Sequence, residues 1–404
     1  MSSQLYVLGV IMKPVLTFIT LLSVILLCGC QSNDIALSHA QKSSQSLYFD
    51  QQFNIPSSFH LETEQEIFML DDDMRAMVEN KLSPFKSVRE KAKLLLEHIF
   101  SQDNIALSYA SNANVTARDA FHNKSANCMS LTIMAYALAK EADLNVNFHE
   151  VEIPEYWVRN GQYNLLTGHV NLTIEEKPNP TQKLIYGSAV MKIDFDPYVV
   201  KESFPKKVIG KNTVLSMFYN NKGGQALVLE NYDIAYQYFK AATQVDPFFS
   251  PAWGNLAVLY KLTDNIQLAE QTYRHAVSLN GNNLTALGNL SILLRSQHKL
   301  VEAKEIESKL NKKRSQNPYY HAVLADEAFY QKNYEQAVIH YKRALKLDNS
   351  IHEIYFGLAK VYYRMNRTSL AKKMMRKAIK FNNINSTNNL YIAKLNFLNS
   401  EQVN

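Results

Sequence analysis

The sequence predicts an α+β domain followed by an all-α solenoid, and three observations support this prediction. The first is a set of small residues that recurs every 34 residues in the C-terminal half. The second is a pair of strand-like segments, at about 165–176 and 184–196, on either side of a proline-containing turn. The third is a series of amphipathic helical segments before these strands. A chain of 404 residues is also longer than one typical domain.

The composition is that of a globular protein. Apolar residues make up 47% of the chain and charged residues 20%, which is too apolar for a disordered protein. The net charge of +6 is mild, the Lys and Arg residues are spread widely, and no nucleic-acid recognition motif accompanies them. We therefore expect no nucleic-acid partner.

Residues 1–29 form a predicted export signal. Lys13 precedes an apolar run from Val15 to Leu27, and Met12 is its natural start. Thirteen helical residues span only about 20 Å, less than the ~30 Å hydrocarbon core of a bilayer. The run is therefore a secretory signal rather than a membrane span. With an ordinary signal of this kind, the mature protein would be soluble and secreted.

The end of this signal, Leu27-Cys28-Gly29-Cys30, resembles the bacterial lipobox. The resemblance implies that Cys30 is lipidated and becomes the mature N-terminus. Cys28 fits that role poorly, because the large Leu27 would stand at the cleavage site. Gln31 resembles the signal for outer-membrane sorting, so we expect an outer-membrane lipoprotein that faces the periplasm. Residues 30–50 are polar and lack periodicity, which predicts a tether behind the lipid anchor.

Residues 213–383 are predicted to form five helix-turn-helix repeats. Alanines recur at intervals of 34 residues without a slip, at Ala235, Ala269, Ala303, Ala337 and Ala371. An aromatic residue often follows four positions later, and a second small residue seven positions later. This period is the tetratricopeptide (TPR) signature, in which small residues let two helices approach closely. The third repeat is the weakest, with Glu307 and Leu310 at those two positions. Residues 384–404 are expected to form a capping helix.

Residues 51–212 are predicted to form the α+β domain, with helices near 64–82 and 87–101 and a third that starts near Cys128. In the mature chain Cys128 would be the remaining thiol, which indicates a reactive group, an intermolecular disulfide or a buried inert cysteine. Ser125 or Asn127 could cap the third helix and so place Cys128 in its first turn. There the helix dipole favours a thiolate, and the backbone N–H groups could hold an oxyanion.

The predicted hairpin can supply a base and its orienting acceptor. His169 lies on the polar face of the first strand, and Asp194 and Asp196 lie on the matching face of the second. A loop centred near residues 181–183 places His169 across from Asp194 or Asp196. A thiolate nucleophile requires this kind of imidazole, held by an acceptor.

Asn-Cys at a helix start, then His on one strand and Asp-Pro after the next, resembles the transglutaminase-like family, over roughly residues 85–200. The resemblance implies a papain-like fold with Cys128 as nucleophile, His169 as base and Asp196 as orienter. Asp196 is preferred to Asp194 because the family Asp is often followed by Pro, as in Asp196-Pro197. In two places the chain departs from the family: Val170 and Asn171 stand where an aromatic often follows the His, and no Gly stands before the Cys region. Bacterial domains of this family are mostly thiol peptidases or amide hydrolases.

Other motifs carry weaker signals. His149, Glu150 and Glu152 lie in one short segment without a zinc-binding motif, and we expect no metal and no cofactor. The acidic run 71–73 lacks the spacing of a calcium loop. Lys222-Gly223-Gly224 lacks the order of a phosphate-binding loop. A basic run at the end of the third repeat is interpreted as a solvated face, with an acidic partner peptide as the alternative; it comprises Lys309, Lys312, Lys313 and Arg314.

Together these features predict an envelope-anchored thiol-dependent hydrolase or acyl transferase that acts on an amide bond of a peptide or protein. The TPR groove would recruit a peptide or protein partner, and the lipid would bind the membrane. One alternative is a non-catalytic periplasmic adaptor whose thiol domain is a relic. Another is an envelope-assembly factor that acts through the repeats alone.

Overall fold

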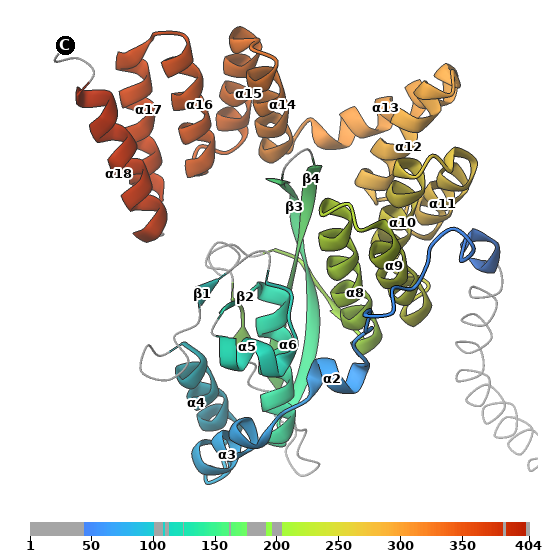
Figure 1. Ribbon diagram of the computed structural model, residues 1–404. Helices are drawn as coiled ribbons and strands as arrows, with labels where there is room; N and C mark the ends of the chain where they lie inside the picture. Colours follow the sequence, from blue (N-terminus) through green and yellow to red (C-terminus); the bar gives the residue numbers. More distant parts are fainter. Residues whose placement is uncertain are drawn as a thin grey trace, which may run out of the picture.

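The computed structural model describes residues 44–100, 108–109, 113–123, 125–160, 163–175, 191–195, 204–382 and 385–400. Helices, a small antiparallel sheet and a long helical array follow one another along the chain (Figure 1). No helix within these residues is both long and apolar enough to cross a membrane. The predicted signal, Cys30 and Asp196 all lie outside the described residues.

The predicted helical stretch 64–82 is two helices, α2 (Glu64–Phe68) and α3 (Asp72–Lys81). The chain turns between them because Asp71 caps α3 and accepts a hydrogen bond from the Met74 backbone N–H at 3.1 Å. The second predicted helix is α4 (Val88–Phe100). A helix that the sequence analysis did not predict, α5 (Ala117–Asn123), comes before the cysteine helix α6 (Cys128–Glu141). A short parallel pair, β1 (Ser108–Tyr109) and β2 (Ser125–Ala126), lies beside them.

The sheet has four strands in the order β5-β4-β3-β6, and every neighbouring pair is antiparallel. The strands are β3 (Asn145–Asn160), β4 (Tyr163–Glu175), β5 (Met191–Ile193) and β6 (Lys206–Ile209). The predicted hairpin is the β4–β5 pair, in which Leu172 faces Ile193. The two long strands β3 and β4 shift register between Val151 and Tyr156, a stretch that contains Pro154. One apolar cluster joins the sheet to α2–α6 and to the next helix, α8 (Lys211–Val228).

The C-terminal part is an all-helical array of TPR type. Its helix pairs are α8 with α9 (Tyr232–Val245), α10 (Ser250–Leu262) with α11 (Ile266–Leu279), α12 (Leu284–Ser296) with α13 (Leu300–Arg314), α14 (Pro318–Tyr330) with α15 (Tyr334–Leu347), and α16 (His352–Arg364) with α17 (Thr368–Phe381). Helix α18 (Asn385–Ser400) closes the array where a capping helix was predicted.

The repeat register is visible in both the turns and the core. Every pair turns through a residue in the left-handed region with φ between 57° and 63°, at Glu230, Asp264, His298, Lys332 and Asn366. The five recurring alanines are fully buried. Two of the recurring aromatic residues pack closely against a glycine. Phe239 lies against Gly223 and Tyr341 against Gly357, where a larger residue would collide with the ring. The predicted helix-turn-helix repeats are therefore confirmed.

The array is interrupted between α13 and α14. One apolar cluster runs from the N-terminal segment to Leu310 in α13, and a separate cluster runs from α14 to α18. The far end of the β3–β4 pair reaches this joint (Figure 1), where Glu155 of β3 contacts Arg314 and Asn317. This interruption accounts for the poor match of the third repeat to the repeat pattern. No α14 core residue joins the apolar cluster of α13, so the position of Glu307 does not need an aromatic side chain, and Glu307 forms an ion pair with Arg295 instead.

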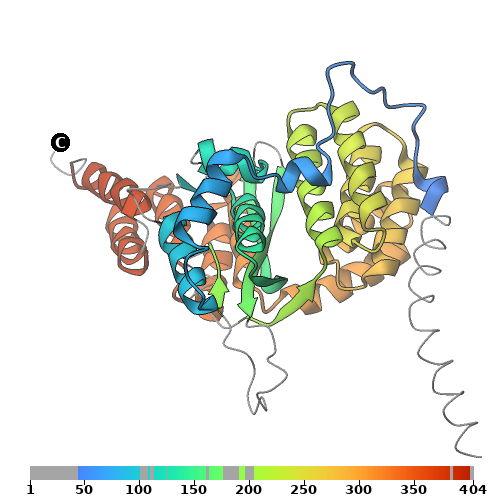
Figure 2. The same cartoon turned by 90° about the horizontal axis from the view of Figure 1, so that it is seen from below.

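Residues 44–54 form a strap along the first two repeats, joined to α2 by an extended connection (Figure 2). This strap includes a short 3-10 helix, η1 (Gln45–Leu47). Tyr48 stacks on Trp253 at 5.6 Å between ring centroids, and Phe53 stacks on Tyr236 at 4.4 Å. Residues 44–50 were predicted to belong to the tether, so the packed chain begins earlier than that boundary.

Candidate functional site

The first turn of α6 is fixed by side chains on both sides of Cys128. Asn127 caps the helix, and its Oδ1 accepts a hydrogen bond from the Ser130 backbone N–H at 2.9 Å. The Ser130 hydroxyl donates to the Ala113 carbonyl at 3.2 Å and accepts from the Val115 N–H at 2.8 Å. Cys128 is thus the first residue of a helix whose start is tied to the segment before α5. Its thiol is half-buried and forms no disulfide.

His169 and Asp194 form a buried pair beside this thiol. Strand β4 carries His169, and Asp194 follows the last residue of β5 by one position. The imidazole Nε2 lies 2.7 Å from Asp194 Oδ1, and each side chain is only 2% exposed. The Cys128 side chain lies close enough to this imidazole to contribute, with Asp194, to the rise in its pKa. Thiol, imidazole and carboxylate therefore meet at one place.

The second oxygen of Asp194 has two further donors. Asn171 donates from Nδ2 to Asp194 Oδ2 at 2.8 Å, and Lys192 Nζ lies 2.8 Å from the same oxygen. Asn171 is fully buried, whereas about a third of the Lys192 side chain is exposed. The carboxylate is thereby held at both oxygens, which fixes the acceptor that faces His169.

The charges of this pair support each other. Burial on its own lowers the pKa of His169, but the hydrogen bond to Asp194, the nearby Cys128 side chain and the charges of both outweigh it and raise that pKa to about 9. Burial likewise raises the pKa of Asp194, but the hydrogen bonds from His169 and Lys192 lower it far below its usual range. At neutral pH the pair is an imidazolium beside a carboxylate.

The sequence analysis placed His169 across from Asp194 or Asp196 and preferred the second. The hydrogen bond in the described residues goes to Asp194. Asp196 lies outside them, so its role stays a prediction. Asn171 and Lys192 were not predicted as members of the site. The signal for Asn171 was present, because the β4–β5 register continued by one pair brings it beside Asp194.

The weaker motifs have structural partners. His149 Nε2 lies 2.7 Å from the Thr173 hydroxyl. Asp71 caps α3 and binds His122 at 2.5 Å. Gly223 lies within α8, where a side chain would collide with Phe239. Among the residues that the structure describes, no three His, Cys, Asp or Glu side chains gather as a metal site.

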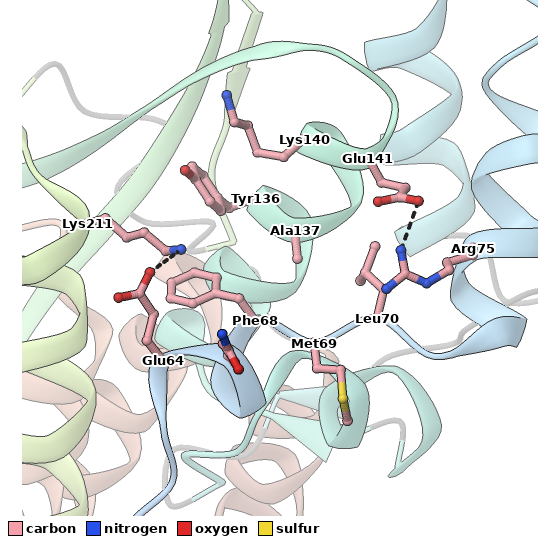
Figure 3. A pocket seen from close by; sticks show the side chains of 11 residues that line it. Glu64, Phe68, Met69, Leu70, Arg75, Tyr136, Ala137, Lys140, Glu141 and Lys211 are labelled. Carbon is pink, nitrogen blue, oxygen red and sulfur yellow. Dashed lines mark hydrogen bonds and ion pairs between the residues drawn. The ribbon is translucent and has the colours of Figure 1, made fainter.

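An open cavity of ≈ 520 Å³ lies at the other end of α6 (Figure 3). Phe68 and Tyr136 contribute its rings, and two ion pairs border it, Arg75–Glu141 at 3.0 Å and Lys211–Glu64 at 2.6 Å. Tyr136 is eight residues from Cys128, roughly 12 Å along the helix. The cavity is thus separate from the thiol.

Comparisons with known proteins identify the repeats. A tetratricopeptide repeat model matches residues 250–283 and 352–385, and a TPR repeat model matches residues 325–366. The first two segments coincide with the pairs α10–α11 and α16–α17, and the third runs from within α14 through α16. The C-terminal part therefore contains TPRs, which generally bind peptides or proteins. No curated protein matches the chain.

Solved structures that resemble a part of the chain include the following three. The structure of pilF from Pseudomonas aeruginosa shares 18% identity and covers 48% of this chain and 88% of its own, with a TM-score of 0.30. TTC0263, a TPR protein of Thermus thermophilus, shares 20% identity and covers 45% of this chain and 99% of its own, with a TM-score of 0.31. YrrB, a TPR protein with an unusual peptide-binding site, shares 14% identity and covers 44% and 92%, with a TM-score of 0.24.

Proposed function

We propose that Cys128, His169 and Asp194 form a transglutaminase-like thiol site that acts on an amide bond of a peptide or protein by hydrolysis or acyl transfer. The observation that carries this proposal is the buried His169–Asp194 pair, which lies near enough to Cys128 for that side chain to raise the pKa of the imidazole. A nucleophile, a proton carrier and an orienting acceptor are the three groups that such a reaction needs.

The geometry suggests a division of roles. Because Nε2 of His169 faces Asp194, Nδ1 is the ring nitrogen that serves the thiol. The thiolate of Cys128 attacks the amide carbonyl carbon, and N–H groups in the first turn of α6 stabilise the resulting oxyanion. The imidazolium then gives its proton to the leaving amine as the C–N bond breaks. The thioester that remains is attacked by water or by a second amine, which regenerates the thiol.

Asp194 fits the role of orienter that the family resemblance assigned to Asp196. It holds the tautomer and the position of the His169 ring. Asn171 and Lys192 in turn hold Asp194, so the acceptor is fixed before substrate arrives.

The repeats would bring the substrate. TPRs generally bind peptides or proteins, and we propose that the groove of this array recruits the protein or peptide on which Cys128 acts. The contact between β3 and the α13–α14 joint links the array to the strand pair that carries His169.

One observation favours the alternative function, a non-catalytic adaptor with a relic thiol domain. The His169 side chain is only 2% exposed, so a substrate reaches the site through the half-buried Cys128 or not at all. In that case the array alone would act, as an adaptor or as an envelope-assembly factor.

The reactivity of the thiol distinguishes these functions. Iodoacetamide labelling of the peptide that contains Cys128, followed by mass spectrometry against pH, should show fast labelling at neutral pH. His169→Ala should slow it, whereas His149→Ala, which removes a second buried imidazole outside the site, should not. Labelling that follows an ordinary thiol titration and ignores His169→Ala would establish the adaptor. If the thiol is reactive, a Cys128→Ala variant in the native envelope would serve to trap the substrate.

We also propose that the protein is an outer-membrane lipoprotein anchored through Cys30. Thirteen residues lie between Cys30 and Ser44, where the described strap begins, so the two are at most about 50 Å apart along an extended chain. Cys30→Ser should abolish lipid labelling and release the protein from membranes, and Cys28→Ser should do neither. Unchanged membrane fractionation of the Cys30 variant would contradict the anchor.

A further inference from the structure

The last two repeats carry matched cations on their second helices. Three positions of α15 are basic, and the residues 34 positions later in α17 are basic as well. The pairs are Lys342 with Arg376, Arg343 with Lys377, and Lys346 with Lys380. All six side chains are exposed. Because they are spaced by one, three or four residues, each triplet lies on one side of its helix. We call these six residues the basic strip.

Cations near the end of a helix often only complement the helix dipole. The dipole alone does not account for the strip. The equivalent helices of the first two repeats, α9 and α11, end at the same repeat position and have no basic residue in their last turn. The strip is therefore a property of the C-terminal repeats and not of the repeat fold.

In the first two repeats, the cations at the equivalent position form ion pairs within the protein. Lys240 and Arg274 occupy the position equivalent to Lys342. Lys240 binds Asp50 at 2.6 Å, and Arg274 binds Glu270 at 2.8 Å and Glu302 at 2.6 Å. Within the described chain, no residue of the basic strip forms an ion pair. Two strip residues lie over rings instead, Lys377 over Tyr355 at 5.2 Å and Lys380 over Phe381 at 5.6 Å.

The charge of the whole region points the same way. Residues 315–404 contain thirteen Lys and Arg and only six Asp and Glu, whereas the whole chain has a net charge of +6. The positive charge of the protein is thus concentrated in its last repeats. Like charges gathered on one part of a protein raise the local concentration of an anionic partner and speed its association.

We propose that the basic strip binds an acidic polypeptide segment that runs across α15 and α17. Helix α13 carries exposed cations at the equivalent positions, Lys309 and Lys312, but the interruption between α13 and α14 separates them from the basic strip. An extended peptide with repeated Asp or Glu residues would offer carboxylates to successive helices, because alternate side chains of an extended chain face the same side.

Two observations favour a peptide over other polyanions. The strip is confined to the C-terminal halves of the helices, while Glu305 and Glu335 are exposed on the N-terminal halves of α13 and α15. A planar anionic bilayer laid on these helices would meet those carboxylates. The Tyr and Phe side chains of α13, α15 and α17, which are Tyr334, Tyr341 and Phe381, are half-buried or buried, which leaves little ring surface on which the bases of a single-stranded nucleic acid could stack.

The test is direct binding to the full-length protein. The probe is a fluorescein-labelled peptide of alternating Glu and Ser, followed by fluorescence anisotropy at several salt concentrations, with a Gln-for-Glu peptide as the neutral reference. We expect binding of the acidic peptide alone, weakened by salt. Arg343→Glu with Lys346→Glu should weaken it about ten-fold, because two attractions become repulsions. Arg343→Lys with Lys346→Arg should bind nearly as well as the wild type.

The matched control is Lys86→Glu with Lys207→Glu, which changes the net charge equally at two exposed sites away from the strip. An equal loss of binding in this control would mean that net charge alone is responsible and would overturn the proposal. Absence of peptide binding by the wild type would overturn it too. Tighter binding to phosphatidylglycerol vesicles or to a thymidine oligonucleotide, lost in the same strip variant, would replace the peptide with that partner.

Discussion

The carboxylate of Glu155 in β3 accepts two hydrogen bonds from the guanidinium of Arg314, the last residue of α13, at 2.7 Å from Nε and 2.9 Å from Nη2. The Thr285 hydroxyl lies 3.2 Å from the same carboxylate, and Asn317 donates to the Glu155 carbonyl at 2.9 Å. These polar contacts stand where the apolar core of the array is interrupted. The position of the last two repeats therefore depends on the sheet as well as on helix stacking.

We expect Glu155→Ala to loosen the α13–α14 joint. The pair is largely buried, with 16% of Glu155 and 13% of Arg314 exposed, so loss of the carboxylate removes two hydrogen bonds from a largely buried guanidinium. The cost should be roughly 1.5–3 kcal/mol, felt mainly at the joint. Hydrogen exchange should show faster exchange in α14 and at the end of β3 with little change in α10. The control is Glu307→Ala, which breaks the more exposed pair with Arg295 and should cost less than about 1 kcal/mol. Equal exchange in both variants would mean that the joint does not rest on Glu155.

The stability of the α+β part should depend on pH through His169. Its folded pKa, about 9, exceeds the ordinary value of 6.5, so the folded state binds the extra proton between these values. This contribution is complete below pH 6.5 and is lost as pH rises through about 9, with a total of about 3 kcal/mol. On the acid side, Asp194 contributes above its ordinary pKa of 3.8, and that contribution is lost only as pH falls through the much lower folded pKa.

Urea unfolding of the wild type and of Asp194→Asn between pH 5 and 10 measures this dependence. The wild type should lose stability between pH 6.5 and 9.5, and the variant should lose much less, because its imidazole lacks the carboxylate. Parallel curves for the two proteins would show that the pair does not set the pH dependence.

The sequence predicts the repeats far better than the site. Ala269 and Ala337 recur because each repeat needs a small residue where its two helices meet, and this need is the same in every repeat. The role of Asn171 depends instead on the register of β4 against β5, and a shift by one residue would turn it to the other face. Glu155 was not predicted because its partner Arg314 lies 159 residues away, on an element whose position no local pattern specifies.

The same contrast holds within the α+β part. The helix that starts at Cys128 was predicted because Asn127 is a local cap. The break between α2 and α3 was missed although Asp71 is also a local cap, because the apolar periodicity continues through it. The choice between Asp194 and Asp196 rested on a family pattern. Both residues lie on the same face of the predicted strand, so the alternation of side chains does not show which of them bonds His169.

Ala337→Leu should destabilise the array by overpacking. Ala337 is fully buried in α15, so a larger side chain forces its neighbours apart at roughly 1–3 kcal/mol. Lys373→Ala, at an exposed position of α17, should stay within about 0.5 kcal/mol of the wild type. Thermal unfolding followed by circular dichroism compares the two. If Ala337→Leu melts no earlier than the wild type, the helix crossing is not as tight as the buried alanine indicates.

Phe53→Ala should release the strap from the repeats. Phe53 is 4% exposed and stacks on Tyr236 with an interplanar angle of 12°. Removal of such a ring typically costs about 3–5 kcal/mol, and here most of this loss falls on a short segment that can detach without unfolding the array. Limited proteolysis should then cleave within residues 44–62 much faster than in the wild type, while the array stays resistant. Ile55→Ala removes an apolar side chain that is 68% exposed and is the matched control, with little expected change. Rapid cleavage in α9 or α10 of the Phe53 variant would show instead that the strap is a part of the core of the first two repeats, which would then unfold together with it.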